Sequence, residues 1–389
     1  MALVPATVLL MFDQPIDDPV ETIKTALSRA LVHYYPMAGR LVVGADGELH
    51  IACTGEGVPF VGASASSSLD EVLTALPLMD LSVRYPADCC RLSDALLQIQ
   101  VTEFTYGGFV VGATWNHVVA DAAGMAQFVQ AVGELASGMP VPSVVPVRTS
   151  DRSLPCMPPP PPPRPRSGTR GPGTGEMASL DLTVSSSLIG RIKAECGGRC
   201  TVFDAVAAVL WRCRTRAVMS NAEAPATLAF TTNVRDLVGF KEGYYGNCLA
   251  LKVVPATTGA VAGSDVKDLV KLIRLAKEKI PELFGSSTSV GGGTEQQAPE
   301  KYNMLGVSSW LNLGFETADM GRGRPARVMW QPQKTVGMLC VLCPPCKGKL
   351  DINILSYCVR PESGWTLCAE LLGSARVFRA RPESGSARR

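Results

Sequence analysis

The chain has 389 residues, of which 46% are hydrophobic and 19% are charged, and its formal net charge is +2. This length favours two domains over one, since single cores rarely grow beyond about 250–300 residues. The balanced charge, without a basic stripe of interleaved aromatics, argues against a nucleic-acid partner, and no uncharged apolar run reaches the roughly 18–20 residues of a membrane span; we therefore expect a soluble, cytoplasmic protein.

The first predicted elements are a strand, a helix and a hairpin. The apolar residues 1–12 predict a strand, because they lack the basic start and the small-residue cleavage site of a signal peptide. A helix is predicted next, with Asp18 as its N-cap and Pro19 at its first position, followed by one apolar face. The pair Asp46-Gly47 between two alternating segments then predicts a hairpin.

The segment "NHVVAD" lies between strands predicted in residues 97–115 and a helix predicted in residues 122–138. It contains His117, one of 3 histidines in the chain, and Asp121 four residues later. The spacing alone is weak evidence, since aspartate is also a favoured helix N-cap. The residue pattern leaves two roles for His117: a packed core side chain with a satisfied hydrogen bond, or a proton-transfer group at the end of a channel.

Residues 146–178 are rich in proline and glycine. A stretch with this many prolines forms neither a helix nor a central strand, because proline lacks the backbone N–H donor and its ring blocks helical neighbours. They predict a semi-rigid crossover between an N-terminal lobe, residues 1–145, and a C-terminal lobe, residues 179–389. A PxxPxR pattern within the proline tract also fits an SH3-domain ligand, but a plain linker is the favoured interpretation. Strands and helices are mixed on both sides of the linker, which predicts two α/β lobes of similar size.

The C-terminal half has helix signals of its own. Thr201 precedes an apolar helical pattern and is its expected N-cap. The elements predicted after it are a helix in residues 202–217, strands in 226–234 and 247–254, a helix in 265–280, a Gly/Ser-rich loop in 285–300, and late strands with a short helix in 364–378.

The 13 cysteines are scattered through a chain with no export signal, so reduced thiols are expected. One cluster, "CVLCPPC", places Cys340, Cys343 and Cys346 at metal-ligand spacing, with Cys358 as the candidate fourth ligand. The favoured interpretation is a buried strand that ends in a Pro-Pro turn, because a strand backbone would splay the first two thiols. No metal is therefore expected.

Several segments, in this order along the chain, resemble the plant BAHD acyltransferases, a family that acylates alcohols and amines from coenzyme A thioesters. The segment around His117, "GGFVVGATWNHVVADAAGMAQF", resembles the family's HxxxD segment, and "LSRALVHYYPMAGRLV" resembles its first helix and AGR turn. Further likenesses are "TVFDAVAAVLWRCRTRA", "GYYGNCL", and "SSWLNLGFETADMGRGRPARV", which falls where the family carries SW…DFGWG. A few dozen residues usually precede the first matched strand, so the family's initial strand is expected to be missing.

The resemblance implies a fold like that of chloramphenicol acetyltransferase, with an active-site channel between the two lobes. It implies that His117 is the general base, which suits the pKa of imidazole, and that no covalent enzyme intermediate forms. In the family the aspartate of the motif turns away from the channel and pairs with an arginine, so Asp121 is expected to be structural. Arg235 is the nearest match to that arginine.

The DFGWG segment is altered in this chain. Asp319, Gly321 and Gly323 remain, which suits a tight turn held by a carboxylate. The family's phenylalanine is replaced by Met320, and its tryptophan by Arg322. Arg322 is a channel candidate that would meet an anionic acyl group or coenzyme A phosphates, although an orientation toward solvent is favoured. Trp115 is the other channel candidate.

The predicted function is the transfer of an acyl group, with a weak preference for an aromatic one, from a coenzyme A thioester to a hydroxyl or amine of a small plant metabolite. The alternative is a catalytically impaired or non-catalytic relative that acts as a binding or regulatory protein. Acyl-coenzyme A is the expected co-substrate, and no permanently bound cofactor is expected. A monomer without nucleic-acid or membrane partners is expected, and the sequence does not identify the residues that contact coenzyme A.

Overall fold

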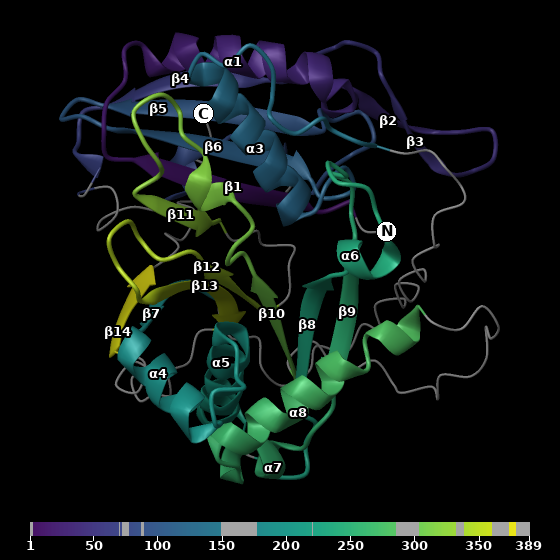
Figure 1. Cartoon of the computed structure of the whole chain (residues 1–389), viewed down its shortest axis with the longest axis vertical. Helices are drawn as coiled ribbons and strands as arrows, with labels where there is room; N and C mark the ends of the chain where they lie inside the picture. The colour runs from purple at the N-terminus through teal and green to yellow at the C-terminus, as the bar shows by residue number, and fades with distance from the viewer. Residues whose placement is uncertain are drawn as a thin grey trace, which may run out of the picture.

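The computed structural model describes residues 3–69, 71, 78–86, 89–148, 177–219, 221–284, 303–331, 338–359 and 373–378. Figure 1 shows these residues as two lobes, each built on one of two large sheets. Three features predicted from the sequence lie outside the described residues: most of the crossover linker with its PxxPxR pattern, the Gly/Ser-rich loop at 285–300, and the short helix expected before residue 373.

The first lobe is formed mainly by the N-terminal half of the chain. Its elements are β1 (Pro5–Phe12), α1 (Pro19–His33), η1 (Tyr35–Ala38), β2 (Arg40–Val43), β3 (Leu49–Ala52), β4 (Phe60–Ala65), η2 (Leu78–Leu81), β5 (Leu97–Phe104), β6 (Phe109–Asn116), α3 (Ala122–Ala136), η6 (Phe315–Thr317) and β11 (Arg327–Trp330). The large sheet has the order β11-β1-β6-β5-β4, and β2 pairs with β3 alone. Helices α1 and α3 pack against each other over this sheet (Figure 1).

The second lobe contains a seven-stranded sheet in the order β14-β7-β13-β12-β10-β8-β9. Its elements are β7 (Met177–Val184), α4 (Ser186–Glu195), α5 (Val202–Val218), β8 (Thr227–Asn233), α6 (Arg235–Val238), β9 (Leu249–Val254), α7 (Thr258–Gly263), α8 (Val266–Glu278), η4 (Pro281–Leu283), β10 (Met304–Ser309), β12 (Leu339–Cys343), β13 (Ile352–Val359) and β14 (Gly373–Phe378). In Figure 1, α4, α5, α7 and α8 lie below the sheet, on the side away from the first lobe.

The helix and turn signals of the sequence correspond to observed elements. Asp18 caps α1 by accepting a hydrogen bond from the Glu21 amide, and proline occupies the first turn as predicted. Thr201 caps α5 in a full capping box. The predicted hairpin is formed by β2 and β3, and Gly47 in its turn has a φ of 78°, a conformation that favours glycine. These predictions are confirmed.

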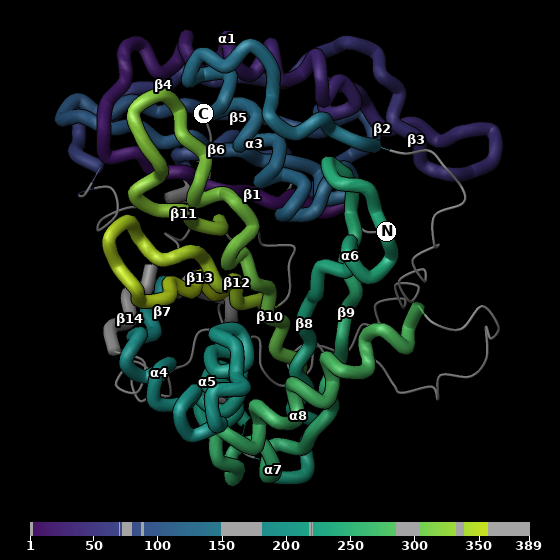
Figure 2. Tube along the Cα trace, viewed as in Figure 1, coloured from purple at the N-terminus to yellow at the C-terminus, as the bar shows by residue number. Residues whose placement is uncertain are grey.

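The C-terminal half also contributes to the first lobe. Figure 2 shows the chain returning there at β11, which pairs antiparallel with β1. Before this strand, Phe315 and Met320 are buried in the first lobe's core. The sequence-based division assigned all of residues 179–389 to the second lobe, and the observed division differs at this segment. The physical reason is that β6 covers only one edge of β1, and β11 supplies hydrogen bonds to the other.

Strand β12 places its two cysteines in different cores. Cys343 packs into the core of the first lobe and Cys340 into that of the second, because successive side chains of a strand point to opposite faces and these two are three positions apart. The described residues contain no group of three histidine, cysteine, aspartate or glutamate side chains arranged to hold a metal ion. The side chain of Cys358 lies outside the described residues.

Across the described ranges, none of the helices combines the length and hydrophobicity needed to cross a membrane.

Candidate active site

His117 directly follows the central strand β6 and begins the loop that leads to α3. Every residue of β6 is buried, whereas His117 is partly exposed. Its backbone amide donates to the Val4 carbonyl at 2.9 Å, which ties the loop to the residue before β1. In the described part of the chain, no residue forms a hydrogen bond with its imidazole ring. The structure therefore presents the ring at the C-terminal end of β6, and none of the described side chains holds it by a hydrogen bond.

His117 lines a pocket of about 250 Å³ that both lobes enclose. Trp115, one of the two channel candidates, forms part of its wall and donates its indole N–H to the Ala120 carbonyl at 2.9 Å. The residues that line the pocket are mostly apolar or aromatic, and they are Val4, Pro5, Ala6, Trp115, His117, Ala122, Ala123, Thr231, Asn233, Leu249, Ser308, Ser309, Trp310, Leu313, Trp330, Leu339 and Val341. A small-molecule site with a few polar groups has this character.

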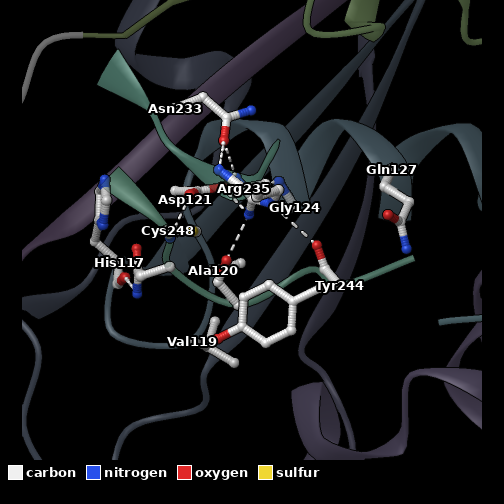
Figure 3. Close-up of polar contacts among 12 residues, drawn as sticks. His117, Val119, Ala120, Asp121, Gly124, Gln127, Asn233, Arg235, Tyr244 and Cys248 are labelled. Carbon is white, nitrogen blue, oxygen red and sulfur yellow. Dashed lines mark hydrogen bonds and ion pairs between the residues drawn. The ribbon is translucent and has the colours of Figure 1, made fainter. Parts of the chain in front are cut away.

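Asp121 is fully buried at the start of α3, and Figure 3 shows that it faces Arg235, with the ring of His117 lying apart from this pair. Its Oδ1 accepts from Nη2 of Arg235 at 2.8 Å and from the Gly124 amide at 2.9 Å. Its Oδ2 accepts from the Cys248 amide at 2.9 Å. The structure thus contains the pair that the resemblance implied, and Asp121 acts as an N-cap as well.

Arg235 is itself held by the segment before β9. Its Nε donates to the Tyr244 carbonyl at 3.1 Å, and its Nη2 also donates to the Gly246 carbonyl at 2.5 Å. Cys248, two residues after Gly246, is buried, and burial raises the pKa of its thiol to about 11. This thiol is therefore protonated near neutral pH, and it is not an activated nucleophile.

The carbonyls of the loop after β6 are bound by side chains from beyond residue 146. The amide nitrogen of Asn247 donates to the His117 carbonyl at 2.8 Å and to the Val118 carbonyl at 3.1 Å. Nη1 of Arg148 donates to the Val119 carbonyl at 2.7 Å. Sequence reasoning did not assign roles to these two residues. The "GYYGNC" segment was the available signal for Asn247, but nothing local indicated which atoms it contacts.

The altered DFGWG segment forms the expected turn. Oδ1 of Asp319 accepts from the amides of Gly321 and Gly323, at 2.8 Å in each case. The two glycines have φ values of 118° and 119°, in the region that favours glycine. Arg322 between them is exposed and is not among the residues that line the His117 pocket. Its position agrees with the favoured orientation toward solvent and not with a place in the channel wall.

The chain is similar to known proteins over most of its length. The Transferase family matches residues 7–357 of the chain. Acyl transferase 15 of Oryza sativa subsp. japonica is 43% identical, covering 93% of this chain and 88% of the relative. A myricetin 3-O-glucosyl 1,2-rhamnoside 6'-O-caffeoyltransferase of Crocosmia x crocosmiiflora is 35% identical, covering 89% and 86% of the two chains.

Solved structures show the same fold at lower sequence identity. Vinorine synthase superimposes with a TM-score of 0.76 at 20% identity, covering 96% of this chain and 90% of that chain. TRI101 of F. sporotrichioides, solved with coenzyme A and T-2, superimposes with a TM-score of 0.71 at 15% identity, covering 97% and 96%. Taken with the sequence relatives, these findings establish that the chain belongs to the Transferase family, the plant BAHD acyltransferases.

Proposed function

We propose that this acyltransferase moves an acyl group from a coenzyme A thioester to a hydroxyl, or an amine, of a small plant metabolite, with His117 as the general base. The observation that carries the proposal is the placement of an imidazole, without a side-chain partner among the described residues, in the wall of a pocket between the two lobes. The buried Asp121 is occupied by Arg235 and by backbone amides, so it is not needed as a proton relay.

The chemistry follows from the weakness of an alcohol as a nucleophile at neutral pH. The neutral imidazole takes the hydroxyl proton while the oxygen attacks the thioester carbonyl. The tetrahedral intermediate then collapses, the carbon–sulfur bond breaks, and the protonated imidazole returns the proton to the thiolate of coenzyme A. No group on the protein is acylated, so the histidine ends each turnover in its starting state.

Two hydroxyl groups in the pocket are candidates for stabilising the intermediate. Oγ1 of Thr231 and Oγ of Ser308 lie 3.3 Å apart and come from the neighbouring strands β8 and β10. Both residues line the His117 pocket. Hydroxyl donors that are already in place where negative charge develops lower the barrier without a reorganisation cost. We assign Thr231 and Ser308 this role within the proposal.

An aromatic acyl group is the favoured cargo. Trp115, Trp310 and Trp330 line the pocket and are nearly or fully buried, and flat aromatic walls favour stacking with a planar ring. The names of two relatives add support: a caffeoyltransferase at 35% identity and, from Taxus canadensis, an N-benzoyltransferase at 31% identity. In the same proposal acyl-coenzyme A arrives as a co-substrate, and the protein acts in the cytoplasm as a monomer without a permanently bound cofactor.

The test is a donor screen with matched histidine variants. Purified protein is given acetyl-, malonyl-, benzoyl- and hydroxycinnamoyl-coenzyme A with mixed alcohols and amines, and both free thiol and product mass are measured. We expect His117→Ala to lower kcat/KM by about 10²–10⁴-fold, the usual contribution of general base catalysis. His50→Ala, at an exposed histidine paired with Asp46, is the control and should keep wild-type activity. Undiminished turnover in His117→Ala would refute the base, and a wild-type protein inactive with every donor would favour the non-catalytic alternative.

A further inference from the structure

We propose that Asn247 is a positioning residue, which fixes the point from which the His117 side chain enters the pocket by holding the backbone that carries it. The inference rests on the proposed role of His117 as the base. In a Ser-His-Asp triad a carboxylate bonds directly to the imidazole and orients it. Here the nearby carboxylate of Asp121 is occupied elsewhere, and none of the described side chains bonds to the ring. The placement of the ring in the pocket therefore depends on how the backbone of its loop is held.

Asn247 is suited to hold that loop. The primary amide has two N–H donors, and its nitrogen lies 2.8 Å from the His117 carbonyl and 3.1 Å from the carbonyl of Val118. One side chain thus binds two consecutive peptide groups, including the one that carries the histidine. On its other side, the His117 amide donates to the Val4 carbonyl. The backbone of His117 is therefore held from both lobes, which leaves mainly the side-chain torsions free.

The position of Asn247 is fixed by its two neighbours. The carbonyl of Gly246 accepts from Arg235, and the amide of Cys248 donates to Asp121. Asn247 thus sits between two residues that the buried Asp121–Arg235 pair holds. In this proposal Asp121 acts on the histidine indirectly: the carboxylate and Arg235 fix residues 246–248, and Asn247 then fixes the histidine loop.

The experiment compares Asn247→Asp and Asn247→Ala with the wild-type protein, using the thioester that gives the highest wild-type turnover in the donor screen. Aspartate keeps the shape of the side chain but has no N–H donor, while alanine removes the side chain altogether. We expect kcat to fall about 10–100-fold in both variants, because a displacement of about 1 Å at a reacting group costs up to about 10²-fold. KM for the thioester should change less than about threefold, and either variant alone suffices for the test if the other fails to fold.

Gln127→Ala is the matched control. This side-chain amide also joins the lobes, by donating to the Gly243 carbonyl at 2.9 Å, but it has no contact with the histidine loop (Figure 3). It should lower the melting temperature about as much as the Asn247 variants and leave kcat within about twofold of wild type. Wild-type kcat in Asn247→Asp, or an equal loss of kcat in Gln127→Ala, would overturn the positioning role.

A double variant separates this inference from the proposed function. If Asn247 acts through the imidazole, His117→Ala combined with Asn247→Asp should be no slower than His117→Ala alone, within about twofold. A further drop by the full factor of the single Asn247 variant would mean that the residue acts independently of His117 and would overturn the inference. If His117→Ala retains wild-type turnover, the proposed base fails, and the role of Asn247 fails with it.

Discussion

Asp121 has no exposed surface, and its two carboxylate oxygens accept hydrogen bonds from three donors: the Gly124 amide in the first turn of α3, the Arg235 guanidinium, and the amide of Cys248 just before β9. A buried charge of this kind is tolerated only when it is paired and fully hydrogen-bonded. Asp121 therefore serves the site by fixing how the two lobes meet, and none of these hydrogen bonds involves the His117 imidazole.

Replacement of Arg235 tests whether its pair with Asp121 has this structural role. Arg235→Met keeps the apolar stem but leaves the Asp121 carboxylate unpaired in a buried place, so we expect the free energy of unfolding to fall by about 3–5 kcal/mol. Lys24→Met breaks an exposed ion pair with Glu21 and should cost less than about 1 kcal/mol. Urea unfolding of both variants measures the difference, and a loss below about 1 kcal/mol in Arg235→Met would contradict a structural role for the pair.

Among the elements, those with local signals were predictable from the sequence. Helix α1 has its N-cap, its proline and its apolar face within one short stretch, and α5 has its capping box in the same way. The turn at Asp319 was predictable because a carboxylate and two glycines two residues apart are enough to form it. In each case the groups that interact are close in the sequence, so no knowledge of the tertiary structure was required.

Elements that depend on distant partners were not predictable from one sequence. The residues of β11 give no local sign that they will pair with β1, more than 300 positions earlier, since only the free edge of β1 selects them. The contact of Asn247 with the His117 carbonyl spans 130 positions and depends on how the two lobes meet. The family resemblance suggested Arg235 as the partner of Asp121, but the sequence alone did not establish the pairing.

Helix α3 offers a test at the scale of an element, because it approaches the segment before β9 without room for a side chain. A Cβ built on Gly124 would lie 1.8 Å from the Tyr245 carbonyl oxygen, so Gly124→Ala must push the helix away from the residues that hold Arg235. We expect strong destabilisation, of about 3 kcal/mol, with loss of activity.

Gly190→Ala in α4 is the matched helical control, because a Cβ there meets nothing within 4 Å. Alanine is the better helix former, so this variant should be neutral or more stable by up to about 1 kcal/mol. Thermal melts and urea curves of the two variants report the comparison. Equal effects of the two substitutions would mean that the close contact at Gly124 contributes nothing to stability.

At the scale of the whole molecule, the two lobes share structural elements and should unfold together. β11 belongs to the first sheet, yet Arg327 at its start forms a 2.6 Å ion pair with Asp181 of β7 in the second. β12 contributes Cys343 to one core and Cys340 to the other. Neither core can open without disturbing a strand that the other core also uses, which makes one cooperative transition the expected behaviour.

The two thiols of β12 predict how this shared stability depends on pH. Burial raises the pKa of the Cys340 thiol to about 11 and that of the Cys343 thiol to about 12, whereas in an unfolded chain a cysteine has a pKa of about 8.5. Above that value the unfolded state releases protons that the folded state keeps, so stability is fully present below about pH 8.5 and is lost as the pH rises toward 11–12. Urea unfolding under reducing conditions at pH 7, 8.5 and 10 should show this decline, and it should be shallower in Cys340→Val, which lacks one of these thiols. If the free energy of unfolding falls equally with pH in the two proteins, the Cys340 thiol does not contribute to the decline.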